Sequence, residues 1–95
     1  MKILNQAVEF EWDLGNRGKN LVSHRVADEE SEEAFFDPQK RGFRDVFHSE
    51  GEERHILLGK TNKNRLLYVV FTIRRGRVRI ISARDINKKE RRLYA

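Results

Sequence analysis

The sequence predicts an α+β fold of two layers, in which an antiparallel sheet carries helices on one face. First, the stretch Leu66–Arg84 is typical of two long strands joined by a tight turn at Arg75-Gly76, because glycine adopts the positive φ that such a hairpin needs. Second, four predicted strands follow one another with only short turns between them, so they pair antiparallel. Third, predicted elements before and after these strands give the order β-α-α-β-β-β-β-α.

The first part of the chain is predicted to form a short strand and a helix. Val8, Phe10 and Trp12 alternate with glutamates and share one face of the strand. Asp13 is the expected N-cap of a helix over 14–24, although two glycines weaken that helix by about 1 kcal/mol each.

A second helix begins at Val26 with Asp28 as its expected N-cap, and Asp37-Pro38 ends it. The four glutamates that follow Asp28 lie in the early turns, where the helix dipole favours negative charge. They are interpreted as a solvated helix face, with a metal-binding or catalytic cluster as the alternative.

Strands over 43–47 and 54–60 then lead into the central hairpin, and Asp85 caps a final helix that reaches Tyr94. The first strand of the hairpin is almost wholly apolar, whereas its partner alternates apolar residues with Arg77 and Arg79. These arginines are therefore expected on the open face of the sheet, where they could bind an anion.

Composition indicates a single domain over residues 1–95 that is soluble and cytoplasmic. Hydrophobic residues make up 38% of the chain and charged residues 37%, which suits a small globular protein. The absence of cysteine excludes disulfides and thiolate metal sites. No apolar run approaches the ~18–20 residues of a membrane span, and the first residues do not resemble a signal peptide.

The net charge of +5 is unevenly distributed. Residues 1–48 contain 7 Lys and Arg against 10 Asp and Glu, whereas residues 49–95 contain 13 against 5. A basic sheet and C-terminal half fit a nucleic-acid partner. A solvated surface and a dock for an acidic partner are the alternatives.

Most enzyme classes lack their residues here, and no cofactor or metal is expected. The three histidines have no ligand-like spacing, the glycines form no phosphate loop, and no serine lies in a nucleophile elbow. Cleavage of RNA by its own 2′-hydroxyl remains, because it needs only proton-transfer groups and cations around the phosphate. Arginine suits the second task and histidine the first.

Several short motifs, in order along residues 10–94, resemble the BrnT toxins of bacterial type II toxin–antitoxin systems. They are Phe10-Glu11-Trp12-Asp13, Asn20-Leu21 with His24, Phe36-Asp37-Pro38, the 45–54 segment with Asp45, His48, Ser49, Glu52 and Arg54, Gly59-Lys60, Arg79 to Arg84, and Glu90-Arg91 with Tyr94. The resemblance implies a RelE-like ribonuclease fold and mRNA cleavage that arrests translation. It also implies neutralisation by a BrnA antitoxin whose ribbon-helix-helix element binds DNA, so that the complex represses its own operon.

Two positions depart from the pattern of that family. Asn16 stands where the family commonly has lysine, and Ser23-His24-Arg25 replaces a Lys-His-Gly sequence. If those lysines contact RNA, the departures weaken this member or alter its preference, and neighbouring Arg17, Lys19 and Arg25 are possible substitutes.

The predicted catalytic residues form one group and the predicted RNA-binding residues another. Arg79 and Arg84 are the first choice for phosphate binding, with a structural pair to Glu90 or Asp85 as the alternative. His48 is a candidate acid or base, or else stabilises its turn, and His24 is a candidate or a helix-end cation. Arg54 belongs to the same basic cleft or forms an ion pair with Glu52. The RNA-binding candidates are Arg77, Lys19, Arg17, Lys88 and Arg91.

The sequence is consistent with three functions. The leading one is a metal-independent ribonuclease toxin with RNA as substrate and a BrnA-like antitoxin as partner, which meets operator DNA only through that antitoxin and no membrane. The second is a module of the same fold that docks the antitoxin and has weakened catalysis, which the departures at Asn16 and Ser23 favour. The third is a basic RNA-binding domain without a toxin's role.

Overall fold

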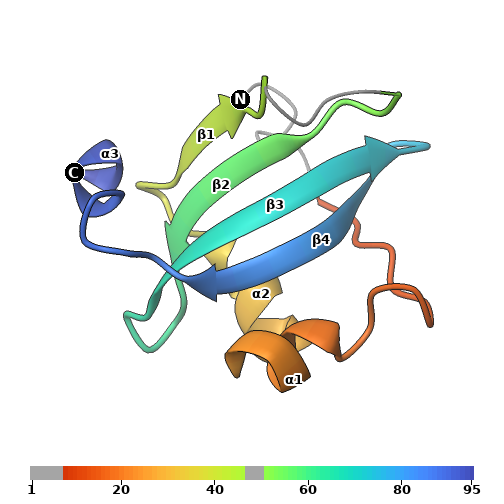
Figure 1. The fold of residues 1–95 in the computed structure, drawn as a ribbon, viewed down its shortest axis with the longest axis horizontal. Coiled ribbons are helices and arrows are strands. Elements are labelled where there is room, and N and C mark those ends of the chain that lie inside the picture. The colour runs from red at the N-terminus through yellow and green to blue at the C-terminus, as the bar shows by residue number, and fades with distance from the viewer. Residues whose placement is uncertain (1–7, 47–50) are drawn as a thin grey trace.

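A computed structural model describes residues 8–46 and 51–95, in which a single four-stranded sheet lies between helices (Figure 1). The elements are α1 (Lys19–His24), α2 (Asp28–Ala34), β1 (Arg41–Arg44), β2 (His55–Lys60), β3 (Leu66–Arg74), β4 (Arg77–Asp85) and α3 (Arg91–Tyr94). No helix in these two ranges is long and apolar enough to cross a membrane.

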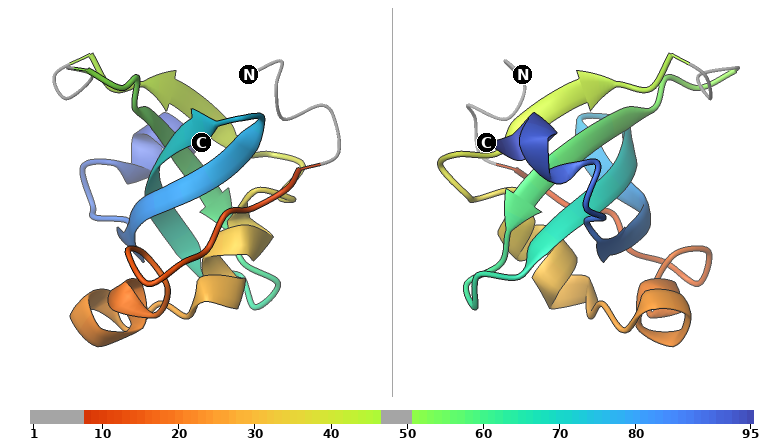
Figure 2. Two further views of the ribbon diagram at one scale, coloured as in Figure 1. Left: turned by 90° about the vertical axis from the view of Figure 1, so that its right-hand side faces the viewer. Right: turned by 60° about the vertical axis from the view of Figure 1, so that its left-hand side comes forward.

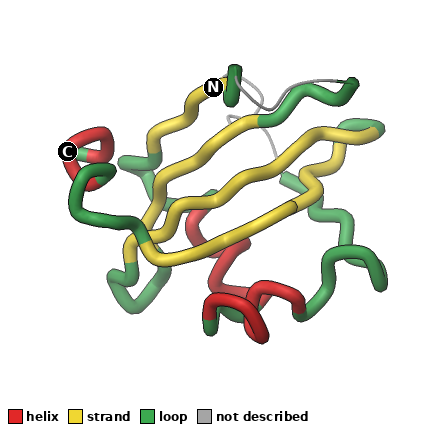
Figure 3. Tube along the Cα trace, in the orientation of Figure 1, coloured by secondary structure: helices red, strands yellow, loops and turns green. Residues whose placement is uncertain are grey.

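The sheet confirms the predicted run of antiparallel neighbours. Its order is β1-β2-β3-β4, so each strand pairs with the next one along the chain (Figure 3). β3 and β4 are the two long strands of the predicted hairpin, and Arg75 and Gly76 turn between them at φ values of 52° and 77°. β3 lies inside the sheet, which explains why it is the most apolar strand.

The strand predicted over residues 8–12 is reduced to one bridge. Phe10 pairs in parallel with Val78 of β4, where Glu11 N–H donates to Val78 O and Val78 N–H donates to Glu9 O, both at 2.8 Å. The segment then leaves the sheet, and Trp12 Nε1–H donates to Glu32 Oε2 of α2 at 2.6 Å. The predicted shared face is nevertheless correct, because Val8, Phe10 and Trp12 all pack against the hydrophobic core.

The hydrophobic core lies between the sheet and the N-terminal helices. Phe35, at the end of α2, packs edge-to-face against Phe71 of β3 and against Phe10, with ring centroids 5.0 and 5.2 Å apart. The buried residues of this core are Val26, Ala34, Phe35, Leu57, Leu67, Val69, Phe71, Val78, Ile80 and Ala83. Aromatic pairs of this geometry add about 1 kcal/mol to the burial of their surface.

The C-terminal helix differs from the prediction that all helices share one face. Leu58 pairs with Tyr68, so both face away from the core, yet Leu58 is fully buried. The α3 end of the chain supplies cover on that side (Figure 2). The Tyr94 ring lies under Lys60 Nζ, which is 5.6 Å from the ring centroid. The open face therefore has α3 at one end, where this four-residue helix contacts β2.

The helix caps are also placed differently from the prediction. The helix predicted over 14–24 begins only at Lys19, because Gly18 takes a left-handed φ of 72° before it. Asp28 is the first residue of α2 instead of its N-cap, and its carboxylate accepts the Gly18 N–H. Glu30 accepts the Ala27 N–H that begins the same helix.

Two further boundaries move at the other end of the chain. Asp85 is the last residue of β4 and pairs with Arg65 at 2.6 Å, so it caps no helix. Asn87 and Glu90 instead bond each other's main-chain N–H groups before α3. The strand predicted over 43–47 is observed at Arg41–Arg44, and its last predicted residue, 47, lies outside the described residues.

Gly59 is predicted to be irreplaceable for steric reasons. A Cβ atom added there would lie 2.3 Å from Ala34 O at the end of α2. We expect Gly59→Ala to lower the free energy of unfolding by about 2 kcal/mol, because backbone cannot yield as a side chain does. Denaturant unfolding measures this, with Lys63→Ala in an exposed turn as the control expected to stay near wild type. Equal stabilities of the two variants would contradict the close packing.

Candidate functional site

A β-bulge in β4 shapes the open face of the sheet. Val70 pairs with Ser82 but the next residue, Phe71, pairs with Ile80, so Ile81 is an extra residue. In a regular strand Ile81 and Ser82 would point to opposite faces. Both instead line one hollow on the face away from the core.

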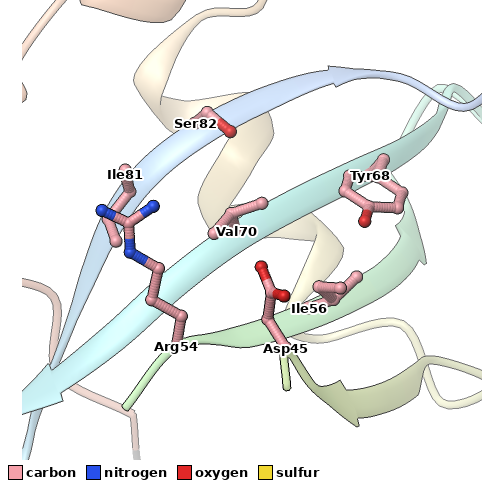
Figure 4. A pocket seen from close by; sticks show the side chains of 7 residues that line it. All are labelled: Asp45, Arg54, Ile56, Tyr68, Val70, Ile81 and Ser82. Atoms are coloured by element: carbon pink, nitrogen blue, oxygen red, sulfur yellow. The ribbon is translucent and has the colours of Figure 1, made fainter. Parts of the chain in front are cut away.

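This open-face hollow has a volume of about 470 Å3 and combines an apolar floor with polar groups (Figure 4). Ile56, Val70 and Ile81 supply the floor from three different strands. The polar lining residues are Asp45, Arg54, Tyr68 and Ser82. In Figure 4 the Arg54 side chain extends from the start of β2 across to Ile81, and the Asp45 carboxylate points over the strands. The hollow can therefore accommodate a flat apolar group beside an anion.

Two of these polar residues also close a loop. Asp45 N–H donates to Arg54 O at 2.9 Å, which joins the two ends of the segment that contains His48. His48 itself lies outside the described residues, so its predicted role stays a prediction. Glu52, suggested as the partner of Arg54, receives two hydrogen bonds from Arg74, at 2.7 and 2.9 Å. The hydrogen bond from Arg74 and, to a smaller extent, the charge of Arg54 lower the pKa of Glu52.

Arg84 lies next to the hollow and is bound to Glu90, one of the two partners suggested from the sequence. Its guanidinium donates to both Glu90 oxygens at 2.9 and 2.7 Å and stacks 4.1 Å from the centre of the Tyr68 ring. Arg84 holds the pKa of Glu90 below its ordinary value, and burial raises the pKa of Tyr68. The Arg84 side chain is 35% exposed. Because it is bonded to Glu90 and stacks on Tyr68, it holds the Tyr68 side chain, which lines the hollow.

Arg79 does not pair with Glu90 or Asp85, the two partners suggested from the sequence. It donates to Glu11 at 3.0 Å and to both oxygens of Asp13, and its side chain is only 13% exposed. The hydrogen bond from Arg79 lowers the pKa of Asp13. Arg79 is not among the residues that line the hollow. The structure therefore places Arg79 as a tie between β4 and the segment before α1.

The remaining predicted residues are distributed around the molecule. Arg77 lies 3.4 Å from Glu9 in an exposed ion pair. His24, Arg17 and Lys19 belong to α1 or the turn before it, a helix whose strand contacts are with β4. Lys88 and Arg91 are exposed around the start of α3. Of the catalytic candidates in the described residues, only Arg54 lines the hollow and only Arg84 adjoins it through Tyr68.

The departure at Asn16 has a structural explanation. Asn16 is 4% exposed, and its amide donates to Glu11 O at 3.0 Å and to Ile80 O at 3.2 Å. Its side-chain oxygen accepts Asp13 N–H. Asn20 accepts the Ala83 N–H at 3.0 Å, on the other side of the bulge. The two asparagines thus satisfy main-chain groups of β4 on both sides of Ile81 and Ser82.

The family model of BrnT, the ribonuclease toxin of type II toxin–antitoxin systems, matches residues 12–90. The chain belongs to the BrnT family. Membership makes RNA the class of substrate and an antitoxin the class of protein partner. The matched range includes every residue that lines the open-face hollow of this BrnT protein. No curated protein sequence matches the chain.

Three polar residues that line the hollow, Asp45, Tyr68 and Ser82, were not predicted from the sequence as site residues. Asp45 was visible as the first residue of the 45–54 motif, and Tyr68 as an outward position of β3. Ser82 carried no such signal, because strict alternation from Val78 and Ile80 puts it on the core face. Only the bulge brings it to the open face.

The asparagines are expected to be necessary for stability. Asn16→Ala leaves the buried Ile80 carbonyl without its partner, so the free energy of unfolding should fall by about 2 kcal/mol. Thermal and denaturant unfolding measure the loss. Asn62→Ala, in an exposed turn, is the matched control and should change stability little. An Asn16→Ala variant as stable as this control would contradict the assigned role.

The Arg84–Glu90 pair is expected to appear in a titration. In Arg84→Met the pKa of Glu90 should rise toward its ordinary value of 4.5, which NMR of the carboxyl carbon measures. Because the folded pKa is lowered, the stabilisation by this pair is present above 4.5 and is lost as pH falls through the folded value. Lys89→Met is the control that should leave the Glu90 titration unchanged. An unchanged pKa in Arg84→Met would refute the pairing.

Proposed function

We propose that this BrnT protein is a metal-independent endoribonuclease toxin that cleaves mRNA at the open-face hollow. The observation that carries the proposal is the position of Arg54: its guanidinium extends over an apolar floor, beside two hydroxyl groups and a carboxylate, inside the range of the family match. A nucleobase fits such a floor, and a phosphate fits the guanidinium.

The chemistry uses the RNA's own 2′-hydroxyl. The 2′-oxygen attacks phosphorus, the bond from phosphorus to the 5′-oxygen breaks, and the products end in a 2′,3′-cyclic phosphate and a 5′-hydroxyl. Arg54 stabilises the charge on the phosphate oxygens. One group takes the 2′ proton and another returns a proton to the 5′-oxygen. His48 is proposed for one of these transfers, because its segment starts and ends at the rim of the hollow.

Arg84 is proposed as a positioning residue. It is held by Glu90 and lies over Tyr68, so it keeps the Tyr68 ring at the edge of the hollow. A phosphate that approached Arg84 would compete with the Glu90 carboxylate for the same N–H groups. Arg79 has the same competition with Asp13 and Glu11, and it does not line the hollow.

The biological setting is proposed from the family. A BrnA-type antitoxin with a ribbon-helix-helix element would neutralise the toxin in the cytoplasm, and the complex would repress its own operon through the DNA-binding element of the antitoxin. The basic charge of residues 49–95 supports both an RNA substrate and an acidic partner segment.

A second function is favoured by the ion pairs. Arg79 and Arg84, the first choices for phosphate binding, both donate to carboxylates. This supports the alternative in which the same fold docks an antitoxin with weakened catalysis. The two functions differ in one measurement, because a docking module would bind the antitoxin without cleaving RNA or arresting growth.

The test is cleavage of RNA by the purified protein in EDTA. We expect Arg54→Gln to lower kcat/KM by at least about a hundredfold, the scale of removing one charged contact to a developing oxyanion. Lys63→Gln removes the same charge from a distant turn and should change the rate less than about twofold. Activity that persists in Arg54→Gln, or a wild-type protein without activity in EDTA, would overturn the proposal.

A further inference from the structure

The two edge strands of the sheet, β4 and β1, differ in how far their outer edges are covered. The outer edge of β4 is covered in turn by the Phe10 bridge, the Asn16 amide and the Asn20 amide. β1, at the opposite edge, is exposed at all four residues. No main-chain group of residues 8–46 and 51–95 bonds to the outer edge of β1. Every second N–H and C=O of β1 therefore points away from β2 and can bond an added strand.

A groove runs beside this edge, between β1 and α3. It has a volume of about 510 Å3 and is lined by Lys40, Arg41, Gly42, Phe43, Arg92, Leu93 and Ala95. Phe43 is 39% exposed and Leu93 52% exposed, so the groove presents two apolar side chains to solvent. Phe43 pairs with Ile56, which puts it on the open-face side, the same side as α3.

The charged side chains that line the groove are all basic. Among the described residues, arginines elsewhere that bind carboxylates include Arg44, Arg65, Arg74, Arg77, Arg79 and Arg84. Lys40 and Arg92 form no ion pair within the described part of the chain, and Arg41 reaches only the main-chain oxygens of Tyr94 and Ala95. No aspartate or glutamate lines the groove.

We propose that an extended segment of the antitoxin, carrying acidic and apolar residues, adds to β1 as a fifth strand. Its main chain would bond the outer edge of β1, and its apolar side chains would cover Phe43 and Leu93. Its carboxylates would pair with Lys40 and Arg92. The proposal rests on the proposed function only in taking the partner to be an antitoxin, since the groove is separate from the open-face hollow.

A protein segment explains these features better than RNA does. Phosphates would use the cations of the groove but would leave the row of main-chain donors and acceptors on β1 unused. An added strand uses both, because main-chain bonds give affinity while alternate side chains enter the groove. Alternation further requires that successive apolar residues of the partner be two positions apart on the Phe43 side.

The test uses the cognate antitoxin, with affinity measured by calorimetry and amide hydrogen exchange followed by NMR. Exchange of the β1 amides that do not bond β2 should slow by at least about tenfold in the complex. Arg92→Glu and Leu93→Ser should each weaken antitoxin binding by at least about tenfold. RNA cleavage by the free variants should stay at the wild-type rate.

Two control variants isolate the groove. Lys63→Glu makes the same charge reversal on the turn between β2 and β3, and Val22→Ser removes an exposed apolar side chain on α1. Both should bind the antitoxin as the wild type does. Unfolding curves of all four variants exclude losses that arise from misfolding.

Two other outcomes would contradict antitoxin binding at the groove. Unchanged β1 exchange in a formed complex would show that the antitoxin binds elsewhere. Groove variants that slow RNA cleavage while keeping antitoxin affinity would assign the groove to RNA. Failure of the proposed ribonuclease function is a separate result, because Arg54→Gln tests it without any antitoxin present.

Discussion

The hydrogen bonds from α1 and the turn before it to the bulged edge of β4 are the constraint on which the site depends. Asn16 bonds Ile80 O and Asn20 bonds Ala83 N–H, so the main-chain groups around the extra residue have partners. Without these partners, buried polar groups would cost about 1–3 kcal/mol each, which would favour a regular strand instead. The bulge in turn brings Ile81 and Ser82 to one face and forms the hollow beside Arg54.

Several of the arginines join one structural element to another through ion pairs. Arg79 joins β4 to the segment before α1, Arg65 joins β4 to α2, and Arg84 joins β4 to the turn before α3. The main effect of these pairs is to set the geometry of the elements that they join. The positive charge that is left without carboxylate partners in the described chain includes Lys40 and Arg92 beside β1, on a different part of the surface from the hollow.

This separation assigns different surfaces to substrate and partner in the two proposals. The hollow lies over β2, β3 and β4 and has an apolar floor for a base. The groove lies beside β1, whose outer edge bonds no main-chain group of the described residues and so offers main-chain groups to a peptide. α3 stands between them, since its preceding turn supplies Glu90 to Arg84 and its last turn supplies Leu93 to the groove. A partner that moved α3 could therefore also disturb the Tyr68 side of the hollow.

The sequence by itself determined the α+β class, the four antiparallel strands, the Arg75-Gly76 turn and the family, because strand alternation, turn residues and motif order are local properties of the chain. It misplaced Asp13 and Asp85 as helix caps, since only the tertiary structure decides whether a carboxylate meets a helix N-terminus or an arginine from a distant part of the chain. The partners of Arg79 and the face of Ser82 were likewise decided by tertiary structure. Pairs 64 to 68 residues apart in the chain and a single-residue bulge depend on how the layers pack, and no local pattern records that packing.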